Sequence, residues 1–354
     1  MPRGLYPTLV LLAAMIGMAA SGHGQNLPVL LPVTAWQGRT MGSDYTVKIV
    51  DDKLAEAQLT ALKAELEATL IEVNRQMSNY LPDSELSRFN KTPENTPFKV
   101  SPDFTKVTRW ALELSRLSNG AFDPTLGPLI NLWGFGETSG NHAVPSAEAL
   151  RTTLAKTGWR HLTINADGSL TKDLPGLALD LGAVAKGFGV DQMIRVLQAH
   201  GLANCYASIA GEVRVTGHNP RGTKWVLGIS VPTDHWREDN PMATQVSISN
   251  QALATSGDYQ KFFRDASGRR LSHLIDPRTG TPVQHHVAGV TVVGPDSMTA
   301  DGLSTTLYVL GLEAGLKFID ARENAAALFI LRENDGTFRQ VASSRFAKLT
   351  GTAP

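Results

Sequence analysis

Stretches with the apolar spacing of α-helices are interspersed along this chain with short apolar runs typical of β-strands, and this mixture limits the folds open to it. In the helix-like stretches, an apolar side chain occurs every three or four positions, which places these side chains on one buried face of a helix. We expect helices at residues 54–74, 103–119, 148–157, 183–200, 299–311 and 312–321.

Several strand-like runs follow one another without a helix between them. We expect strands at residues 37–50, 163–164, 170–171, 177–181, 205–209, 212–216, 225–231, 245–249, 287–293 and 325–331. A turn at Met41-Gly42-Ser43 and a loop rich in Gly and Pro over residues 123–136 interrupt the pattern. This mixed order of strands and helices is typical of an α+β fold. A length of 354 residues corresponds to one large domain or two closely packed ones.

Composition places the chain among globular proteins and argues against one class of partner. Hydrophobic residues make up 42% and charged residues 19%, which is ordinary for a domain with a large core. Lys plus Arg and Asp plus Glu both number 33, so the basic excess of nucleic-acid-binding proteins is lacking. Cys205 is the single cysteine, which excludes an intramolecular disulfide, and its apolar surroundings predict a buried, unreactive thiol.

The first 24 residues have the character of an export signal. Arg3 supplies a positive charge, and residues 9–20 form an apolar stretch too short to span a bilayer comfortably. The alternative is an uncleaved anchor that associates the chain with the inner membrane. We therefore expect an exported protein in the periplasm, or facing it from that membrane, with residues 25–36 as a linker.

The segment from Ser272 to Gly280 places His273, Asp276 and Arg278 in one tight turn. An imidazole held in this way could act as a general base or contact a phosphate. The alternative is a turn histidine bonded to nearby backbone, with Asp276 and Arg278 simply pairing with each other.

Asp301 and Thr305 are four residues apart, so they share one face of the expected helix at 299–311. A carboxylate and a hydroxyl are hard oxygen donors suited to Mg²⁺, which often also binds substrate phosphates. The alternative is a carboxylate near a helix N-terminus with an unrelated threonine.

The segment from Asp180 to Gly187 follows an apolar run and opens the expected helix at 183–200. Its small residues would let backbone amides approach phosphate oxygens, with Lys186 adding positive charge. The alternative is a turn whose small residues only serve packing. Tyr80, in a loop, is a candidate to stack on a flat ring, whereas His285-His286 is interpreted as a solvated pair and residues 256–259 as a turn.

Taken together, these segments resemble the FAD:protein FMN transferase family, the ApbE flavin transferases. The similar blocks occur in the family's order at residues 41–43, 77–80, 84–90, 120–129, 132–136, 180–187, 211–212, 219–222, 254–259, 272–280 and 300–305. The resemblance covers roughly residues 37–331. We therefore expect a transferase domain at 37–335 and a C-terminal tail at 336–354.

The resemblance implies an enzyme that splits FAD with the help of Mg²⁺. FMN would pass to a Thr or Ser hydroxyl of an acceptor protein as a phosphoester, and AMP would leave. The implied fold has two intimately packed lobes of mixed sheet and helices, with the flavin in a cleft between them. The acceptor would belong to an exported or membrane-bound redox complex, because no complete acceptor motif occurs in this chain.

The resemblance also assigns roles to residues of this sequence. Asp301, the Thr305 hydroxyl and the Ala183 carbonyl would bind Mg²⁺. FAD would be bound by Met41, Tyr80, Ala121, Phe122, Asp123, Asp180, Lys186 and Ile275. His273 and Asp180 would be the catalytic candidates. Two other functions stay open at this point, which are a Mg²⁺-dependent FAD pyrophosphatase and an exported flavin-binding protein without catalysis.

Overall fold

The computed structural model describes residues 30–136, 142–234 and 241–351. The expected export signal at 1–24 lies outside the described residues. Within them, no helix combines the length and the apolar character needed to span a membrane. The last four residues of the expected linker already belong to the first strand, β1 (Val33–Thr40).

In the described part of the chain, eight strands form one antiparallel sheet in the order β1-β2-β5-β6-β9-β14-β15-β16. The remaining bounds are β2 (Ser43–Val50), β5 (Cys205–Ile209), β6 (Glu212–Val215), β9 (Gln251–Gly257), β14 (Val287–Gly294), β15 (Ala326–Arg332) and β16 (Phe338–Ala342). Every residue of β14 is buried. A strand covered on both faces needs apolar side chains at every position, which explains its unbroken run of small and branched residues.

Short two-stranded ladders extend from this sheet. They are β3 (Leu162–Ile164) with β4 (Leu170–Lys172), β7 (Trp225–Ser230) with β8 (Met242–Ile248), β10 (Phe262–Arg264) with β11 (Arg270–Ser272), and β12 (Ile275–Asp276) with β13 (Thr281–Pro282). All four are antiparallel. The last two ladders hold the turn segment that begins at Ser272.

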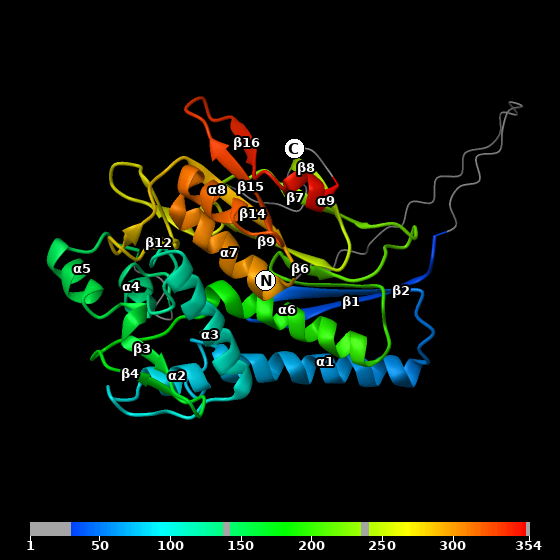
Figure 1. The fold of residues 1–354 in the computed structure, drawn as a ribbon, viewed down its shortest axis with the longest axis horizontal. Helices are drawn as coiled ribbons and strands as arrows, with labels where there is room; N and C mark the ends of the chain where they lie inside the picture. Colours follow the sequence, from blue (N-terminus) through cyan, green and yellow to red (C-terminus); the bar gives the residue numbers. More distant parts are fainter. Residues whose placement is uncertain (1–29, 137–141, 235–240, 352–354) are drawn as a thin grey trace, which may run out of the picture.

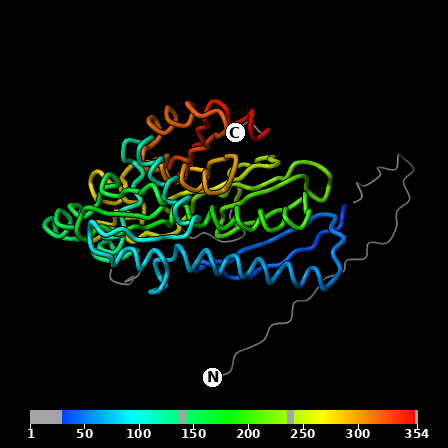
Figure 2. The backbone as a smooth tube through the Cα atoms, turned by 60° about the horizontal axis from the view of Figure 1, so that its bottom comes forward, coloured from blue at the N-terminus to red at the C-terminus, as the bar shows by residue number. Residues whose placement is uncertain are grey.

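Helices cover one face of the sheet, and α6 and α1 lie side by side there in both views (Figure 1, Figure 2). The helix bounds are α1 (Glu56–Met77), α2 (Glu85–Asn90), α3 (Pro102–Leu117), α4 (Gly127–Leu132), α5 (Ala147–Leu154), α6 (Gly182–Ala199), α7 (Ser297–Leu310), α8 (Leu312–Asp320) and α9 (Phe346–Thr350). The other face is covered by the β7–β8 hairpin and α9, whose side chains share a core with β6 and β15.

The alternation of side chains in β15 shows how both faces of the sheet are buried. Leu328 and Ile330 pack with the hairpin and α9, whereas Ala327 and Phe329 pack with the helical side. Successive strand residues point to opposite faces, so one apolar strand contributes to two cores. The α+β prediction is confirmed, while the division into two lobes around a flavin cleft stays a prediction.

Three segments differ from the elements expected. The expected strand at residues 37–50 is divided into β1 and β2, and the expected turn at Met41-Gly42-Ser43 that divides it is confirmed. The expected loop at 123–136 contains α4. The expected strand at 177–181 is not formed, because the Asn90 side chain takes the role of a strand partner. Its amide accepts from the Leu179 N–H at 2.7 Å and donates to the Leu179 carbonyl at 2.9 Å.

The sheet also continues beyond the expected boundary at residue 335. The region expected as a tail includes β16, which pairs with β15, and α9, in which Phe346 is fully buried. The segment expected as a turn at 256–259 begins inside β9, between β6 and β14. Sequence patterns missed β9 because it consists mainly of small residues with little apolar character.

Leu70 and Ile71 of α1 allow a direct test of this packing. Leu70 is 1% exposed against α6 and β2, whereas Ile71 is 66% exposed. Leu70→Ala should lower the free energy of unfolding by about 2–5 kcal/mol through lost burial and a cavity. Ile71→Ala should change it by less than about 0.5 kcal/mol. Chemical denaturation measures both, and equal losses would contradict the orientation of α1.

Candidate functional site

The crossing of α6 and α7 positions the first group of candidate residues. Gly187 of α6 lies against the start of α7, where a Cβ atom would be only 2.3 Å from the Ser297 carbonyl oxygen. Glycine is therefore required for this close approach. Asp191 of α6 completes the contact, because its two carboxylate oxygens accept from the Ser297 and Met298 N–H groups at 2.9 Å each. These N–H groups are otherwise without partners at a helix N-terminus.

The crossing brings Asp301, in the second turn of α7, against α6. The Gly187 N–H donates to Asp301 Oδ2 at 3.0 Å. In a regular α-helix, this N–H is the one that faces the carbonyl of the residue four positions earlier, Ala183. The hydrogen bond thus holds the Asp301 carboxylate at the turn of α6 that includes Ala183. Thr305, one turn later on α7, is hydrogen-bonded to Ser256 of β9 at 2.9 Å.

Two buried carboxylates and one half-buried ammonium group meet at this crossing. Lys186 Nζ lies 2.6 Å from Glu212 Oε1 of β6 and 3.7 Å from Asp301 Oδ1. Burial raises the pKa of Glu212 to about 7 and also raises that of Asp301, against the opposing attraction of Lys186. Burial lowers the pKa of Lys186, but the two carboxylates outweigh this and the net pKa is raised.

The donors at this crossing fit a hard cation. Two carboxylates oppose one ammonium group, and Glu212 Oε2 is buried with no hydrogen-bond partner in the described part of the chain. A carboxylate, a hydroxyl and a backbone carbonyl are all oxygen ligands of the kind Mg²⁺ prefers. No cluster of three or more His, Cys, Asp or Glu side chains among the described residues could hold a metal ion, so a metal here would rely on such a mixed set.

Asp180 joins three segments just before α6. Its carboxylate accepts from Asn79 Nδ2 at 2.6 Å and from the Gly182 N–H at 2.7 Å, and its own N–H donates to the Pro124 carbonyl at 2.8 Å. The loop that carries Tyr80 and the loop after Asp123 therefore meet at the N-terminus of α6. Such an end is favourable for phosphate groups because its amides point outward.

The other residues expected to bind FAD have different environments. Tyr80 is 64% exposed and Ala121 and Phe122 are buried. Met41 extends toward α6, since its methyl carbon would be 3.0 Å from a Cβ at Gly189. Asp123 uses both carboxylate oxygens within the protein, accepting from Thr125 and from the Trp159 N–H. Ile275 is buried in a separate cluster with Trp133.

His273 follows β11 and is half-buried. Its Nδ1 lies 3.2 Å from the Lys261 carbonyl oxygen, and its ring contacts Phe135 edge-on at 6.3 Å between centroids. Burial lowers the pKa of His273 to about 4, and the positive charges of Lys261 and Lys186 add to this effect. The imidazole is therefore neutral at pH 7. Asp276 and Arg278, the other polar residues of this turn, pair with each other at 2.7 Å.

Two residues of this region received no role from sequence reasoning. Glu212 completes the charge cluster, and its signals were an acidic residue inside an apolar strand and its place in the similar block at residues 211–212. Asn79 holds Asp180, and its signals were its position next to Tyr80 and its place in the similar block at residues 77–80. Cys205 is fully buried as expected, and burial raises the pKa of its thiol to about 12.

The comparisons with known proteins cover nearly the whole chain. The model of the ApbE family matches residues 41–329. A Haemophilus influenzae protein named FAD:protein FMN transferase is 41% identical over 324 residues, which cover 90% of this chain and 92% of that protein. A Vibrio cholerae protein of the same name is 42% identical over 309 residues, which cover 87% and 90%.

Solved structures match equally broadly. The apo crystal structure of the flavinyl transferase ApbE from Pseudomonas stutzeri has a TM-score of 0.82 at 37% identity, covering 92% of this chain and 99% of that one. The flavin transferase ApbE from Vibrio cholerae has a TM-score of 0.81 at 40% identity, covering 90% and 99%.

Gly187 provides a test of the helix crossing. Gly187→Ala places a methyl group against rigid backbone of α7 and should lower the free energy of unfolding by about 1–3 kcal/mol. Gly189→Ala is the matched control, since its nearest neighbours are the flexible ends of Met41 and Ile209 at 3.0 Å. Thermal unfolding of both variants measures the difference. A larger loss for Gly189→Ala would contradict the close approach of α6 and α7.

His273 should make stability depend on pH. Its folded pKa of about 4 lies below the ordinary value of 6.5, so the unfolded chain binds a proton that the folded chain excludes between these values. The resulting stabilisation is fully present above pH 6.5 and is lost as the pH falls toward 4. In denaturation experiments, the free energy of unfolding of the parent should therefore fall toward that of His273→Gln as the pH is lowered from 6.5 to 4. A difference independent of pH would contradict the lowered pKa.

Proposed function

The chain belongs to the ApbE family, and on this premise we propose that it transfers FMN from FAD to a Thr or Ser hydroxyl of an acceptor protein, with AMP as the leaving group. The relatives named FAD:protein FMN transferase align over nearly their whole length. The observation that carries the proposal is the Asp301 carboxylate, held by Gly187 at the α6 turn that includes Ala183, with Thr305 one turn away.

Mg²⁺ would be held by Asp301, the Thr305 hydroxyl and the Ala183 carbonyl. Bound there, it would neutralise charge on the pyrophosphate of FAD and orient the phosphate under attack. The protein contributes a site with more carboxyl groups than ammonium groups, since Glu212 and Asp301 both lie near the single Lys186. Lys186 also keeps these two carboxylates from repelling each other.

The acceptor hydroxyl must lose a proton as it attacks. Its oxygen forms a bond to the FMN phosphorus, the bond from that phosphorus to the bridging oxygen breaks, and AMP leaves with the electron pair. His273 can take the proton, because its imidazole is neutral at pH 7 and a neutral imidazole has one nitrogen that accepts. Asp180 is the second candidate for this task, and its bonds to Asn79 and Gly182 keep its carboxylate oriented.

The FAD itself would lie along the N-terminal end of α6. Tyr80 is exposed and can stack on a flat ring, while Met41, Ala121, Phe122, Asp123, Asp180, Lys186 and Ile275 are the further binding residues that we propose. Ala121 and Phe122 would contribute backbone groups and shape, because their side chains are buried. Asp123 would act by fixing its loop through Thr125 and Trp159.

We further propose that the chain works outside the cytoplasm. Its first residues combine Arg3 with an apolar stretch at 9–20, as export signals do. The acceptor would then be part of an exported or inner-membrane redox complex that faces the periplasm.

The proposal is tested by incubating the purified protein with FAD, Mg²⁺ and a flavin-acceptor domain, followed by intact mass measurement. We expect the acceptor to gain the mass of FMN, and we expect EDTA to prevent this gain. AMP and free FMN without acceptor modification would support a pyrophosphatase instead. FAD that stays intact would support a flavin-binding protein and contradict catalysis.

Substitution of Asp301 tests the metal site separately. Asp301→Asn keeps the shape of the side chain but removes its charge, and should lower the rate of transfer at least about a hundredfold through weaker metal binding. Asp335→Asn, in an exposed turn where Asp335 bonds only to Thr337, is the matched control and should leave the rate unchanged. Equal rates in both variants would remove Asp301 from the proposed site.

A further inference from the structure

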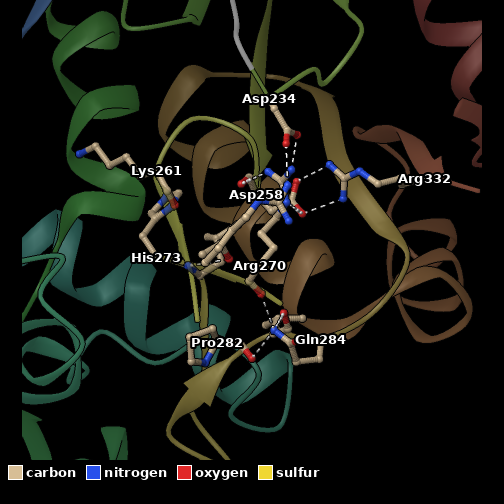
Figure 3. Close-up of polar contacts among 12 residues, drawn as sticks. Asp234, Asp258, Lys261, Arg270, His273, Pro282, Gln284 and Arg332 are labelled. Carbon is tan, nitrogen blue, oxygen red and sulfur yellow. Dashed lines mark hydrogen bonds and ion pairs between the residues drawn. The ribbon is translucent and has the colours of Figure 1, made fainter. Parts of the chain in front are cut away.

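A network of ion pairs lies behind β11, on the side of a cavity of about 410 Å³. Asp258, Arg270 and Arg332 line this cavity together with Ser272, and Asp234 faces the same guanidinium groups (Figure 3). Arg332 pairs with Asp258, and Arg270 and Arg264 pair with Asp234. Each charge of this network has an opposite partner, with three guanidinium groups facing two carboxylates, and we interpret the network as a structural support.

Asp258 is the centre of this network. It is 6% exposed, and its carboxylate accepts from both terminal nitrogens of Arg332 at 2.9 and 3.0 Å. Arg270 reaches the same residue twice, with Nε 3.6 Å from the carboxylate and Nη1 donating to the Asp258 carbonyl at 3.2 Å. A bidentate ion pair of this kind fixes the orientation of the two side chains as well as the distance between them. Asp258 is thus bound to β15 through Arg332 and to β11 through Arg270.

The segment that Asp258 begins ends at Lys261, just before β10. The Lys261 carbonyl is the partner of His273 in two ways (Figure 3), accepting from the His273 backbone N–H at 3.1 Å and lying 3.2 Å from Nδ1. A carbonyl oxygen only accepts hydrogen bonds, so Nδ1 must carry the proton. In a neutral imidazole this leaves Nε2 unprotonated, as a proton acceptor requires.

The cavity explains why the ion pairs matter for this arrangement. Ordinary segments are held by close packing on all sides, but the segment from Asp258 to Lys261 borders open space on the side of Asp258 and Arg270. At that end the segment is held by the ion pairs of Asp258, by the bond from the Asp258 N–H to the Ala288 carbonyl at 3.1 Å and by the buried side chain of Tyr259. Loss of the Asp258 charge would leave Arg332 without the carboxylate that orients it, and Arg270 with Asp234 as its remaining carboxylate partner.

We propose that Asp258 is a positioning residue for His273. With Arg332 and Arg270, it holds residues 258–261 so that the Lys261 carbonyl keeps the His273 proton on Nδ1 and its Nε2 ready to accept. This inference rests on the proposed function, in which His273 takes the proton of the acceptor hydroxyl. Asp258 itself touches neither FAD nor the reacting hydroxyl in this scheme.

The test combines spectroscopy with kinetics on Asp258→Asn. In protein labelled with ¹⁵N-histidine, the imidazole nitrogens of His273 are assigned by comparison with His273→Gln. The parent should show one tautomer, with the proton on Nδ1, and Asp258→Asn should show a mixture. A base displaced by about an ångström costs up to about a hundredfold in rate, so kcat should fall about tenfold to a hundredfold. The KM for FAD should change by less than about threefold, since FAD binding is not affected.

Two further variants separate positioning from general loss of structure. Arg332→Lys keeps the positive charge but cannot form the bidentate ion pair with Asp258. Its tautomer mixture and its kcat should lie between those of the parent and those of Asp258→Asn. Glu333→Gln alters the adjacent residue, which pairs with Arg339 rather than Asp258, and should behave like the parent. If Asp258→Asn does not fold, Arg332→Lys decides with the same two measurements.

The proposal is overturned if folded Asp258→Asn keeps the single Nδ1 tautomer, whether kcat falls or not. It is also overturned if the tautomer becomes mixed while kcat stays at the parent value. Failure of the proposed function gives a different result, because the parent protein would then not transfer FMN to the acceptor. Failure of the proton-accepting role of His273 would instead leave His273→Gln with the parent rate of transfer. The tautomer of His273 in Asp258→Asn would still report whether Asp258 positions the ring.

Discussion

The close crossing of α6 and α7 is the constraint on which the rest of this structure depends. It requires a glycine at residue 187, because the Ser297 carbonyl occupies the space that a side chain would need. It also requires Asp191, which satisfies the first N–H groups of α7 from the neighbouring helix. Because both helices lie against the same sheet, a larger separation at this point would move Asp301 away from α6. The candidate metal donors therefore depend on backbone packing as much as on their own identity.

The crossing also determines the electrostatics of the site. Burying two carboxylates with one ammonium group is unfavourable unless the charges are closely paired or a cation is shared. Lys186 pairs with Glu212 at 2.6 Å and with Asp301 less closely at 3.7 Å, and Glu212 retains one unpartnered oxygen. These buried oxygen donors are the observation that supports the proposed metal site. The fold stabilises this cluster through the large apolar cores on both faces of the sheet.

His273 is held in place by a different kind of contact. The residues at the α6–α7 crossing are held by packed helices, whereas His273 is held by one carbonyl at the end of a short connection. That connection borders a cavity and is fixed at its start by the ion pairs of Asp258. The two halves of the proposed chemistry are thus supported in different ways. Rigid packing serves the metal donors, and directed hydrogen bonds set the protonated nitrogen of the imidazole.

The sequence alone predicted most of the long helices and the turn at residues 277–280, although His273 lies before this turn, between β11 and β12. Helical spacing in α1, α3 and α6 and the apolar runs of β14 and β15 are local patterns, and each predicted its element. The resemblance to the ApbE family depended on short blocks and is supported by a family match over residues 41–329. The sequence did not predict β9, whose small residues form a strand only between β6 and β14. It also could not show that Lys186, Glu212 and Asp301 meet, or that Asp258 supports His273. Only the tertiary structure decided these contacts, because Gly187 and Asp301 are 114 positions apart and such pairs are set by helix crossings and strand order, which local patterns do not record.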